Sequence, residues 1–256
     1  MQKNPIFDTK LLRMKSFISW STGKDAAFTM HQLIAQNKKP DLLFTTVNQD
    51  VNRVSMHGVR IELLEAQAQM LQTELWQVPL ANDVDMTSYN QIMEENLKQL
   101  KARGYDTAYF GDIFLDDLRT FREYQLQKVG FTTYFPIWKN DTQALARQII
   151  ASGIKAVVVS VNAKLLDKSF VGRLYDEIFL NDLPANVDRC GENGEFHTFV
   201  FDSPDFIAPI DIELGDIVFK SYKPCTKSDQ NSYQKQAENT TTEWDTGFWY
   251  IDVLMS

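Results

Sequence analysis

The first half of the chain alternates between short apolar runs and longer segments with helical periodicity. Apolar, partly β-branched runs of five to seven residues predict buried strands. The expected strands are 15–20, 41–47, 75–80, 106–110 and 131–137. Apolar side chains three or four positions apart predict helices between them, at 24–36, 58–74, 88–103 and 117–129. This alternation favours an α/β fold, with a parallel sheet and helices on both faces.

Ligands of such sheets bind outside the carboxyl ends of the strands. The loops that would lie there are 20–25, 47–58, 80–87 and 111–116.

The second half of the chain has a different pattern. A helix at 142–152 and a buried strand at 156–161 are followed by short strands at 196–201, 210–222 and 248–254. We therefore predict a nucleotide domain over 14–140 and a smaller C-terminal α+β domain over 141–256. The polar stretch 226–243 has almost no aliphatic residues and is predicted to be a mobile loop.

Composition excludes several classes of protein. The net charge is -8, which argues against a broad basic surface for extended nucleic acid. Two cysteines are too few for a disulfide framework, and no apolar run is long enough to span a membrane. The first residues lack the apolar core of a secretory signal, so a cytoplasmic location is expected. A homodimer is left open.

The turn after the first strand, residues 19–25, is the first candidate site. Ser21, Thr22 and Gly23 are small, so backbone N–H groups at the start of the following helix could approach an anion closely. Lys24 adds a positive charge. A plain strand-to-helix turn with Ser21 or Thr22 as helix cap explains the same residues equally well. A Walker A loop is excluded, because Ile18 stands where its first glycine is required and Asp25 where its hydroxyl is required.

A second candidate site is the segment 190–200, with sequence Cys-Gly-Glu-Asn-Gly-Glu-Phe-His-Thr-Phe-Val. It holds two carboxylates, an imidazole and a hydroxyl within seven residues. Taken alone, a solvated turn with a surface histidine is the simpler interpretation.

Several motifs together resemble a known family. Residues 21–26 resemble the PP-loop Ser-Gly-Gly-x-Asp-Ser of the adenine nucleotide α-hydrolase-like superfamily, with Thr22 and Ala26 departing from it. With the segment 190–200, the set resembles the diphthine–ammonia ligase family and its bacterial relatives. The further motifs are Met-His-Gly-Val-Arg at 56–60, Phe-Gly-Asp-Ile at 110–113, Phe-Pro-Ile-Trp at 135–138 and Phe-Val-Gly-Arg at 170–173.

The resemblance implies a Rossmann-like PP-loop domain, of the HUP type, that binds ATP and Mg²⁺. It implies an ATP-dependent ligase that adenylylates a carboxylate, releases pyrophosphate and transfers ammonia to give an amide and AMP. Asp25 would hold Mg²⁺, a cation that prefers oxygen ligands. The nucleotide would be bound by Trp20, Ser21, Thr22, Gly23, Lys24, Asp25, His57, Arg60, Gly111 and Asp112.

The same resemblance places an unknown carboxylate acceptor and ammonium at the second motif, against Glu192, Glu195, His197 and Thr198. Catalysis would rest on Lys24, Asp25, Glu195 and His197, with His197 as general base. Two alternatives stay open. One is a nucleotide-binding module without chemistry, and the other is a tRNA-modifying PP-loop enzyme, which would need a reactive cysteine pair and a basic face.

Overall fold

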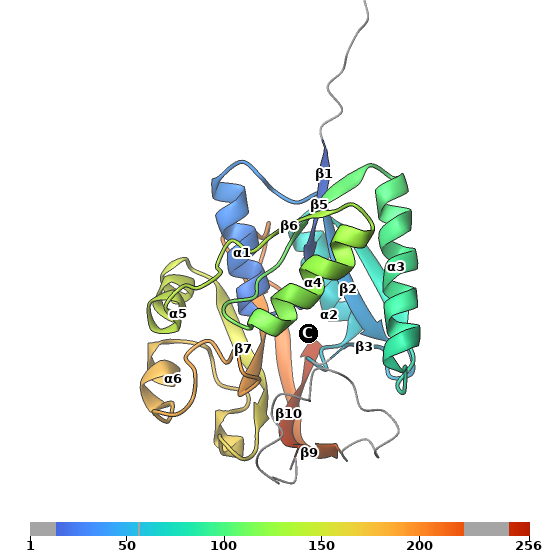
Figure 1. Cartoon of the computed structure of the whole chain (residues 1–256). Coiled ribbons are helices and arrows are strands. Elements are labelled where there is room, and N and C mark those ends of the chain that lie inside the picture. The colour runs from blue at the N-terminus through green and yellow to red at the C-terminus, as the bar shows by residue number, and fades with distance from the viewer. Residues whose placement is uncertain (1–13, 56, 223–245) are drawn as a thin grey trace, which may run out of the picture.

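The structure, a computed structural model, describes residues 14–55, 57–222 and 246–256. Its first half is a six-stranded sheet between helices (Figure 1). The strands are β1 (Lys15–Ser19), β2 (Leu42–Asn48), β3 (Arg53–Val54), β4 (Glu74–Leu80), β5 (Tyr105–Tyr109) and β6 (Thr132–Tyr134). The helices are α1 (Lys24–Ala35), α2 (Ile61–Met70), α3 (Met86–Ala102) and α4 (Asp116–Lys128).

The parallel strands of this sheet lie in the order β4-β2-β1-β5-β6, and the short β3 pairs antiparallel with the end of β2. The chain leaves β1 toward β2 on one side and returns to β5 on the other. This reversal opens a crevice at the carboxyl ends of β1 and β5, which is where α/β sheets bind ligands.

Alternate residues of the central strands fill two separate cores. Ile18 and Leu43 belong to the core under α1 and α2, whereas their neighbours Phe17 and Leu42 belong to the core under α3. A strand that is buried on both faces reads as a continuous apolar run, which is why these strands could be recognised in the sequence. The predicted α/β class is confirmed.

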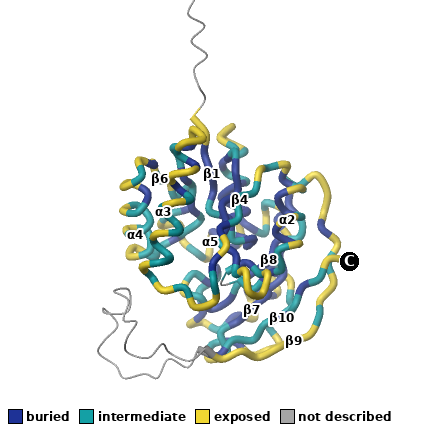
Figure 2. The backbone as a smooth tube through the Cα atoms, turned by 90° about the vertical axis from the view of Figure 1, so that its right-hand side faces the viewer, coloured by how far each residue is buried: buried dark blue, intermediate teal, exposed yellow. Residues whose placement is uncertain are grey.

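The second half forms a four-stranded antiparallel sheet in the order β8-β7-β10-β9. It lies across the carboxyl edge of the first sheet (Figures 1 and 2). Its strands are β7 (Lys155–Asn162), β8 (Phe196–Asp202), β9 (Ile212–Tyr222) and β10 (Thr246–Met255). Helices α5 (Thr142–Ala151) and α6 (Glu177–Asp182) and the 3₁₀ turn η1 (Lys168–Phe170) accompany it.

Several predicted boundaries were wrong for local reasons. The helix expected from residue 58 begins at Ile61, because Gly58 has φ +68° and Arg60 is extended. The strand expected at 131–137 is limited to β6, and Pro136 lies in the turn that follows it. No sequence pattern indicated β3, η1 or α6, which span only two, three and six residues. The predicted loop at 226–243 lies outside the described residues.

The division at residue 140 stays a prediction. One apolar core joins the two sheets, since Ile18 of β1 and Val157 of β7 belong to the same buried cluster.

Candidate functional site

The turn between β1 and α1 has an unusual backbone. Thr22 has φ +69°, a left-handed conformation that costs a β-branched residue about 1–2 kcal/mol. Gly23 follows as the N-cap of α1, and no side chain of its own turn caps the helix. Thr22 therefore adopts the conformation for which the PP-loop normally uses glycine, at a cost in strain.

The second sheet completes this turn. The backbone N–H of Lys24 donates to Thr198 Oγ1 at 3.1 Å, and Val200 N–H donates to the carbonyl of Thr22 at 3.0 Å. A Cβ on Gly23 would lie 3.2 Å from the carbonyl oxygen of Thr198 and 3.4 Å from the ring of His57. Glycine is thus required at position 23 because β8 and the β3–α2 loop approach the backbone closely.

Lys24 does not extend into solvent. Its side chain is only 2% exposed, and its Nζ donates to Asp25 Oδ2 at 2.9 Å and to the carbonyl of Cys190. The ammonium also lies over the rings of Tyr175 and Phe196, 5.3 and 5.1 Å from their centroids. Burial lowers the pKa of Lys24, but the charge and hydrogen bond of Asp25, together with the charges of Cys190 and Glu192, more than offset it, so the pKa is raised and the lysine stays charged.

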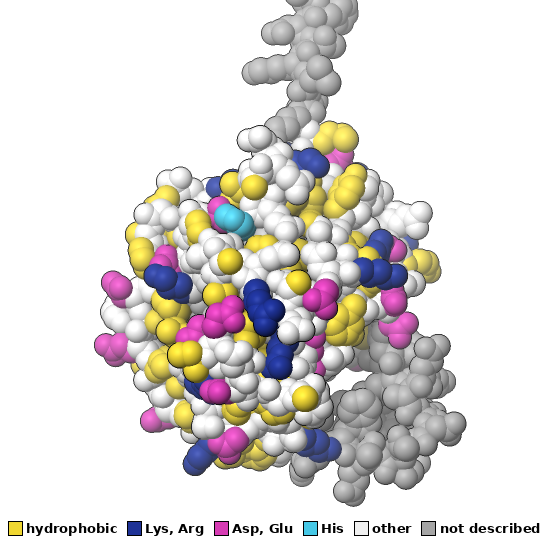
Figure 3. Space-filling model, turned by 90° about the vertical axis from the view of Figure 1, so that its left-hand side faces the viewer, with side chains coloured by type: hydrophobic (Ala, Val, Ile, Leu, Met, Phe, Trp, Pro, Cys, Tyr) yellow, Lys and Arg dark blue, Asp and Glu magenta, His cyan; other side chains and the backbone are white. Residues whose placement is uncertain are grey.

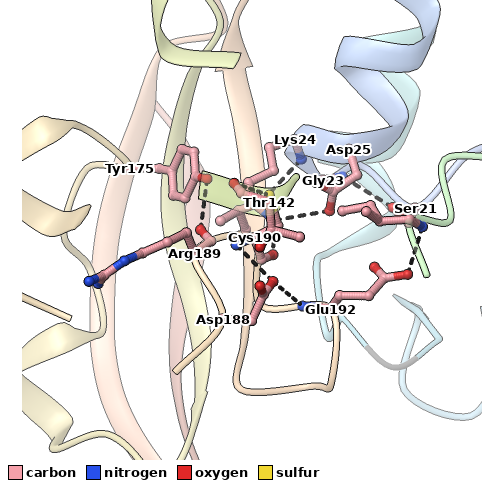
Figure 4. A network of polar contacts seen from close by, with 12 residues as sticks. Ser21, Gly23, Lys24, Asp25, Thr142, Tyr175, Asp188, Arg189, Cys190 and Glu192 are labelled. Atoms are coloured by element: carbon pink, nitrogen blue, oxygen red, sulfur yellow. Dashed lines mark hydrogen bonds and ion pairs between the residues drawn. The ribbon is translucent and has the colours of Figure 1, made fainter. Parts of the chain in front are cut away.

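Three carboxylates, those of Asp25, Asp112 and Glu192, lie near one another at this turn, and Figure 4 shows Asp25 and Glu192. Glu192 Oε1 accepts from Ile113 N–H at 2.7 Å, which joins the second motif to the loop after β5. Burial raises the pKa of Glu192 to about 7; the hydrogen bond from Ile113 N–H lowers it, and the charges of Asp25 and Asp112 raise it. Burial raises the pKa of Asp25 and Asp112 as well.

Gly111 makes this convergence possible. A Cβ on Gly111 would lie 3.1 Å from the backbone of Asp25, so the loop after β5 packs directly on the start of α1. Its neighbour Asp112 forms an ion pair with Arg122 of α4, with 3.0 Å between Oδ2 and Nε.

Buried polar atoms at the turn lack partners. Thr22 Oγ1, Asp25 Oδ1 and His57 Nδ1 have no hydrogen-bond partner within the part of the chain that the structure describes. Unsatisfied buried groups are rare in folded proteins and call for a ligand, an ion or a water molecule.

Such atoms fit a magnesium–nucleotide complex. Nowhere in 14–55, 57–222 or 246–256 are three or more His, Cys, Asp or Glu side chains grouped to hold a metal. Mg²⁺ usually needs only one or two carboxylates, because phosphates and water supply its other ligands. Asp25 with its free Oδ1, and Asp112 nearby, suit that requirement.

Two histidines lie against each other at the same place. The rings of His57 and His197 are 4.5 Å apart between centroids. Burial and the nearby charge of Lys24 lower the pKa of His197 to about 4, and burial next to His197 lowers the pKa of His57 well below its ordinary value. Both rings are therefore neutral near pH 7 and are weak bases there.

A cavity of about 290 Å³ opens from the turn toward α3 and α4. Its volume is close to the lower end of the range for ligand pockets, about 300–1,000 Å³. Polar side chains line the end next to the turn, Asn90, Glu94, Arg122 and Gln125 of α3 and α4 also line the cavity, and much of the remaining lining is apolar and aromatic. The polar lining there includes Ser21, Thr45, Ser55 and His57, and the apolar lining includes Phe17, Phe44, Met93, Leu97, Phe110 and Phe121.

Three predicted site residues are engaged elsewhere. The indole of Trp20 is buried and donates to Gln67 Oε1 at 2.8 Å. Arg60 makes a two-pronged ion pair with Asp252 of β10, at 3.0 and 2.7 Å. Glu195 is buried within its own loop. The functional roles expected for these three residues stay predictions.

The carboxylate of Glu195 organises the second motif. It accepts from the backbone N–H groups of Asn193 at 2.9 Å and Asp188 at 3.2 Å, and from the Asn193 amide at 3.0 Å. These bonds hold the loop that carries Cys190 and Glu192 against α1.

Sequence reasoning missed Gln67, whose amide donates to the carbonyls of Thr22 and Val200 at 3.0 and 2.6 Å. A signal existed, because Gln67 is the one polar residue on the buried face of α2, beside Leu63, Leu64 and Ala68. No sequence pattern indicated that the Tyr175 ring and the Cys190 carbonyl contact the Lys24 ammonium.

The surface supports no broad basic site on the face drawn in Figure 3, where basic side chains lie among acidic ones. None of the helices in the described part of the chain is long and apolar enough to cross a membrane.

Comparison with known proteins places both halves of the chain. The diphthamide synthase N-terminal domain matches residues 14–133, and the diphthamide synthase C-terminal domain matches residues 141–231. A solved structure described as a predicted subunit of tRNA methyltransferase from Methanocaldococcus jannaschii aligns with a TM-score of 0.44 and 14% identity, over 76% of this chain and 100% of that one.

Proteins named diphthine–ammonia ligase align with segments of this chain that differ in length. The one from Danio rerio is 33% identical over 105 residues, which is 38% of this chain and 38% of that protein. The one from Homo sapiens is 32% identical over 90 residues, or 33% of this chain and 34% of that protein. The one from Mus musculus is 25% identical over 226 residues, or 78% of this chain and 84% of that protein. The chain thus aligns with little more than a third of the fish and human relatives.

The two matched domains cover most of the chain, and they contain the turn at α1 and the loop at 188–195 that meet in one site. The chain belongs to the diphthamide synthase family.

Proposed function

We propose that this protein is an ATP-dependent ligase that adenylylates a carboxylate and then transfers ammonia to it, forming an amide. The observation that carries the proposal is the meeting of two motifs: in the second motif, Thr198 accepts a hydrogen bond from the backbone of the turn at 21–25, and Glu192 accepts one from the loop after β5. A reaction between a nucleotide and a second substrate needs both held at one place. The names of the relatives support the same reaction class.

The cavity and the turn suit the two ends of ATP. Adenosine would occupy the aromatic cavity above β1, and the phosphates would extend over residues 21–25 toward the N-terminus of α1. Lys24 is a positioning residue in this scheme. Its ammonium is held by Asp25 and Cys190, so it orients the Asp25 carboxylate and adds positive charge from beneath the turn.

Mg²⁺ would be held by Asp25 with assistance from Asp112. When bound, it would neutralise charge on the phosphates as pyrophosphate departs. The raised pKa values of both carboxylates support a site that a cation completes, because a nearby positive charge restores the ionised form.

Glu192 is the group best suited to accept a proton from ammonium. Its pKa of about 7 allows it to hold NH₄⁺ as a carboxylate and to take one proton near neutral pH, which leaves NH₃. The ammonia nitrogen would then attack the acyl carbon, forming the C–N bond while the bond to AMP breaks, and the proton that the nitrogen loses on forming the amide would pass to the departing AMP phosphate or to water. His197, with a pKa of about 4, is a weaker base, and as a neutral ring it would orient the acceptor.

Thiol chemistry is disfavoured. Cys190 is buried, its Sγ donates to the Thr142 carbonyl at 3.4 Å, and burial raises the pKa of its thiol. A persulfide carrier of a tRNA-thiolating enzyme needs an accessible thiolate.

The test measures AMP and pyrophosphate formation with ATP, Mg²⁺, ammonium and a panel of carboxylates that includes a diphthine-bearing peptide. We expect AMP and pyrophosphate in equal amounts, dependent on the carboxylate, and loss of both in Asp25→Ala. Exposed Glu95 on α3 supplies the control variant Glu95→Ala, which should keep full activity. Release of ADP and phosphate instead would contradict adenylylation. Tight ATP binding without turnover for any carboxylate would favour a non-catalytic module.

A further inference from the structure

The outer edge of the second sheet is long and apolar. Among the residues that the structure describes, β9 pairs with β10 alone and ends the sheet. Leu214, Ile217 and Phe219 are 48%, 44% and 51% exposed, and β9 runs as an exposed band along the outside of the molecule in Figure 2. Soluble proteins normally protect such edges with charges, proline or short strands, because a free edge pairs with other strands.

A bulge in β9 decides which side chains share a face. Ile217 lies opposite Ile251 and Leu214 opposite Val253, so Gly215 and Asp216 together face a single residue of β10. Side chains of a strand normally alternate between its two faces, and the extra residue shifts this alternation by one residue on either side of the bulge.

Two faces of β9 follow from this register. Leu214, Ile217 and Phe219 lie on the face of Val253, Ile251 and Trp249, which packs on the core. Glu213 and Lys220 lie on the opposite face. In agreement with this, Lys220 Nζ lies 5.5 Å from the centroid of the Tyr250 ring.

The edge is complementary to itself. When two copies pair antiparallel about a two-fold axis normal to the sheet, residues that lie opposite each other must belong to the same face. With the bulge counted as one position, Ile217 is the midpoint between Glu213 and Lys220. Pairing centred on Ile217 then sets Glu213 against Lys220 of the second copy, twice.

The apolar residues fall into the same register. Leu214 would lie opposite Phe219 of the second copy, and Ile217 opposite its own equivalent. Both opposite-charge pairs and aromatic–aliphatic pairs stabilise antiparallel strands, so charge and shape favour one alignment.

We propose that β9 is the interface of a homodimer, in which two copies join their second sheets into one eight-stranded sheet centred on Ile217. The interface is isologous, since the same residues serve both copies. It lies on the side of β10 away from β7 and β8, and the proposal does not depend on the reaction that the chain catalyses.

Charge reversal tests the register. Sedimentation equilibrium should show a mass twice the monomer's 29.5 kDa for the wild type. Glu213→Lys and Lys220→Glu each place like charges opposite each other twice, so each should raise the dimer dissociation constant on the order of ten-fold. The double variant restores two opposite-charge pairs and should return the constant to near the wild-type value. Glu95→Lys, an exposed change on α3, is the matched control and should have no effect.

A cysteine at the centre gives an independent measurement. Opposite residues of paired strands have Cα atoms about 4.5–5.5 Å apart, within reach of a disulfide. Ile217→Cys, made with Cys225→Ser, should therefore form a disulfide-linked dimer on mild oxidation. Ile207 is more exposed than Ile217, at 62% against 44%, but lies outside β9, so Ile207→Cys in the same background should remain monomeric on a non-reducing gel.

A wild type that stays monomeric up to the hundred-micromolar range would overturn the proposal. So would a dimer whose dissociation constant is the same in the single charge variants and the double variant, because it would use another surface. Pairing of β9 with residues 223–245 or with a strand of another protein would give a monomer in these assays, and counts against the dimer.

Discussion

Replacing Glu192 with glutamine tests the electrostatics of the site through stability. The pKa of Glu192 is raised from 4.5 to about 7, so the folded protein holds this proton more tightly than the unfolded chain. The resulting contribution to stability is fully present below about pH 4.5. It is lost as pH rises through 7, where folding must bury a carboxylate among other carboxylates.

The magnitude follows from the two pKa values. Their difference corresponds to an upper limit of about 3 kcal/mol, at about 1.4 kcal/mol per pKa unit. Glu192 is partly exposed, and solvent screening reduces the effect to about 1–2 kcal/mol. Glutamine keeps the carbonyl oxygen that accepts from Ile113 N–H and resembles the protonated acid.

The assay is urea unfolding at pH 5 and pH 8. Glu192→Gln should match the wild type at pH 5 and exceed its free energy of unfolding by about 1–2 kcal/mol at pH 8. The control Glu95→Gln should shift stability equally at both pH values. A Glu192→Gln protein that is no more stable than the wild type at pH 8 would refute the reasoning, because it would mean that the carboxylate is not strained by its surroundings.

Three further variants test the turn and the second motif. Lys24→Met removes the buried cation and leaves Asp25 unpaired, so thermal or urea unfolding should show a loss of about 2–4 kcal/mol. Thr22→Gly relieves the strain of the left-handed backbone but removes a fully buried side chain. The gain from lost strain and the loss of buried apolar contact should cancel, which leaves the free energy of unfolding within about 1 kcal/mol of the wild type. A larger loss of stability would show that Thr22 is not strained. Glu195→Gln faces an amide NH₂ toward the N–H groups of Asn193, and should cost about 1–2 kcal/mol by urea unfolding while ATP binding by calorimetry stays measurable.

The fold of the first half was predictable because its central strands are buried on both faces. Continuous apolar runs such as β2, and β7 in the second half, can be recognised without knowledge of their neighbours. Helix ends were less predictable. The start of α2 depends on Arg60, which is held extended by its ion pair with Asp252, 192 residues away in sequence.

The candidate site was predictable in its members but not in their orientation. Local sequence suggested that Lys24 would face phosphate, and the structure instead surrounds its ammonium with Asp25, Cys190 and two aromatic rings. Glu195 likewise turns into its own loop. The orientation of Lys24 depends on its contact with Cys190, 166 positions away, which no local pattern contains.

Those distant contacts bear on how the site works. Gly23 offers α1 no side-chain cap, and the cap comes instead from Thr198 of β8. The Lys24 ammonium is stabilised by Cys190 of the same segment, so the second motif supports the shape of the turn at 21–25. In the proposed reaction, a nucleotide that orders this turn would therefore also favour the position of Glu192, and an acceptor that orders the second motif would favour the turn. Coupling of this kind is reciprocal in free energy. The coupling follows from two features of the helix N-terminus, the glycine cap and the buried lysine. Both would destabilise the helix if the second motif did not supply the Thr198 cap and the Cys190 carbonyl.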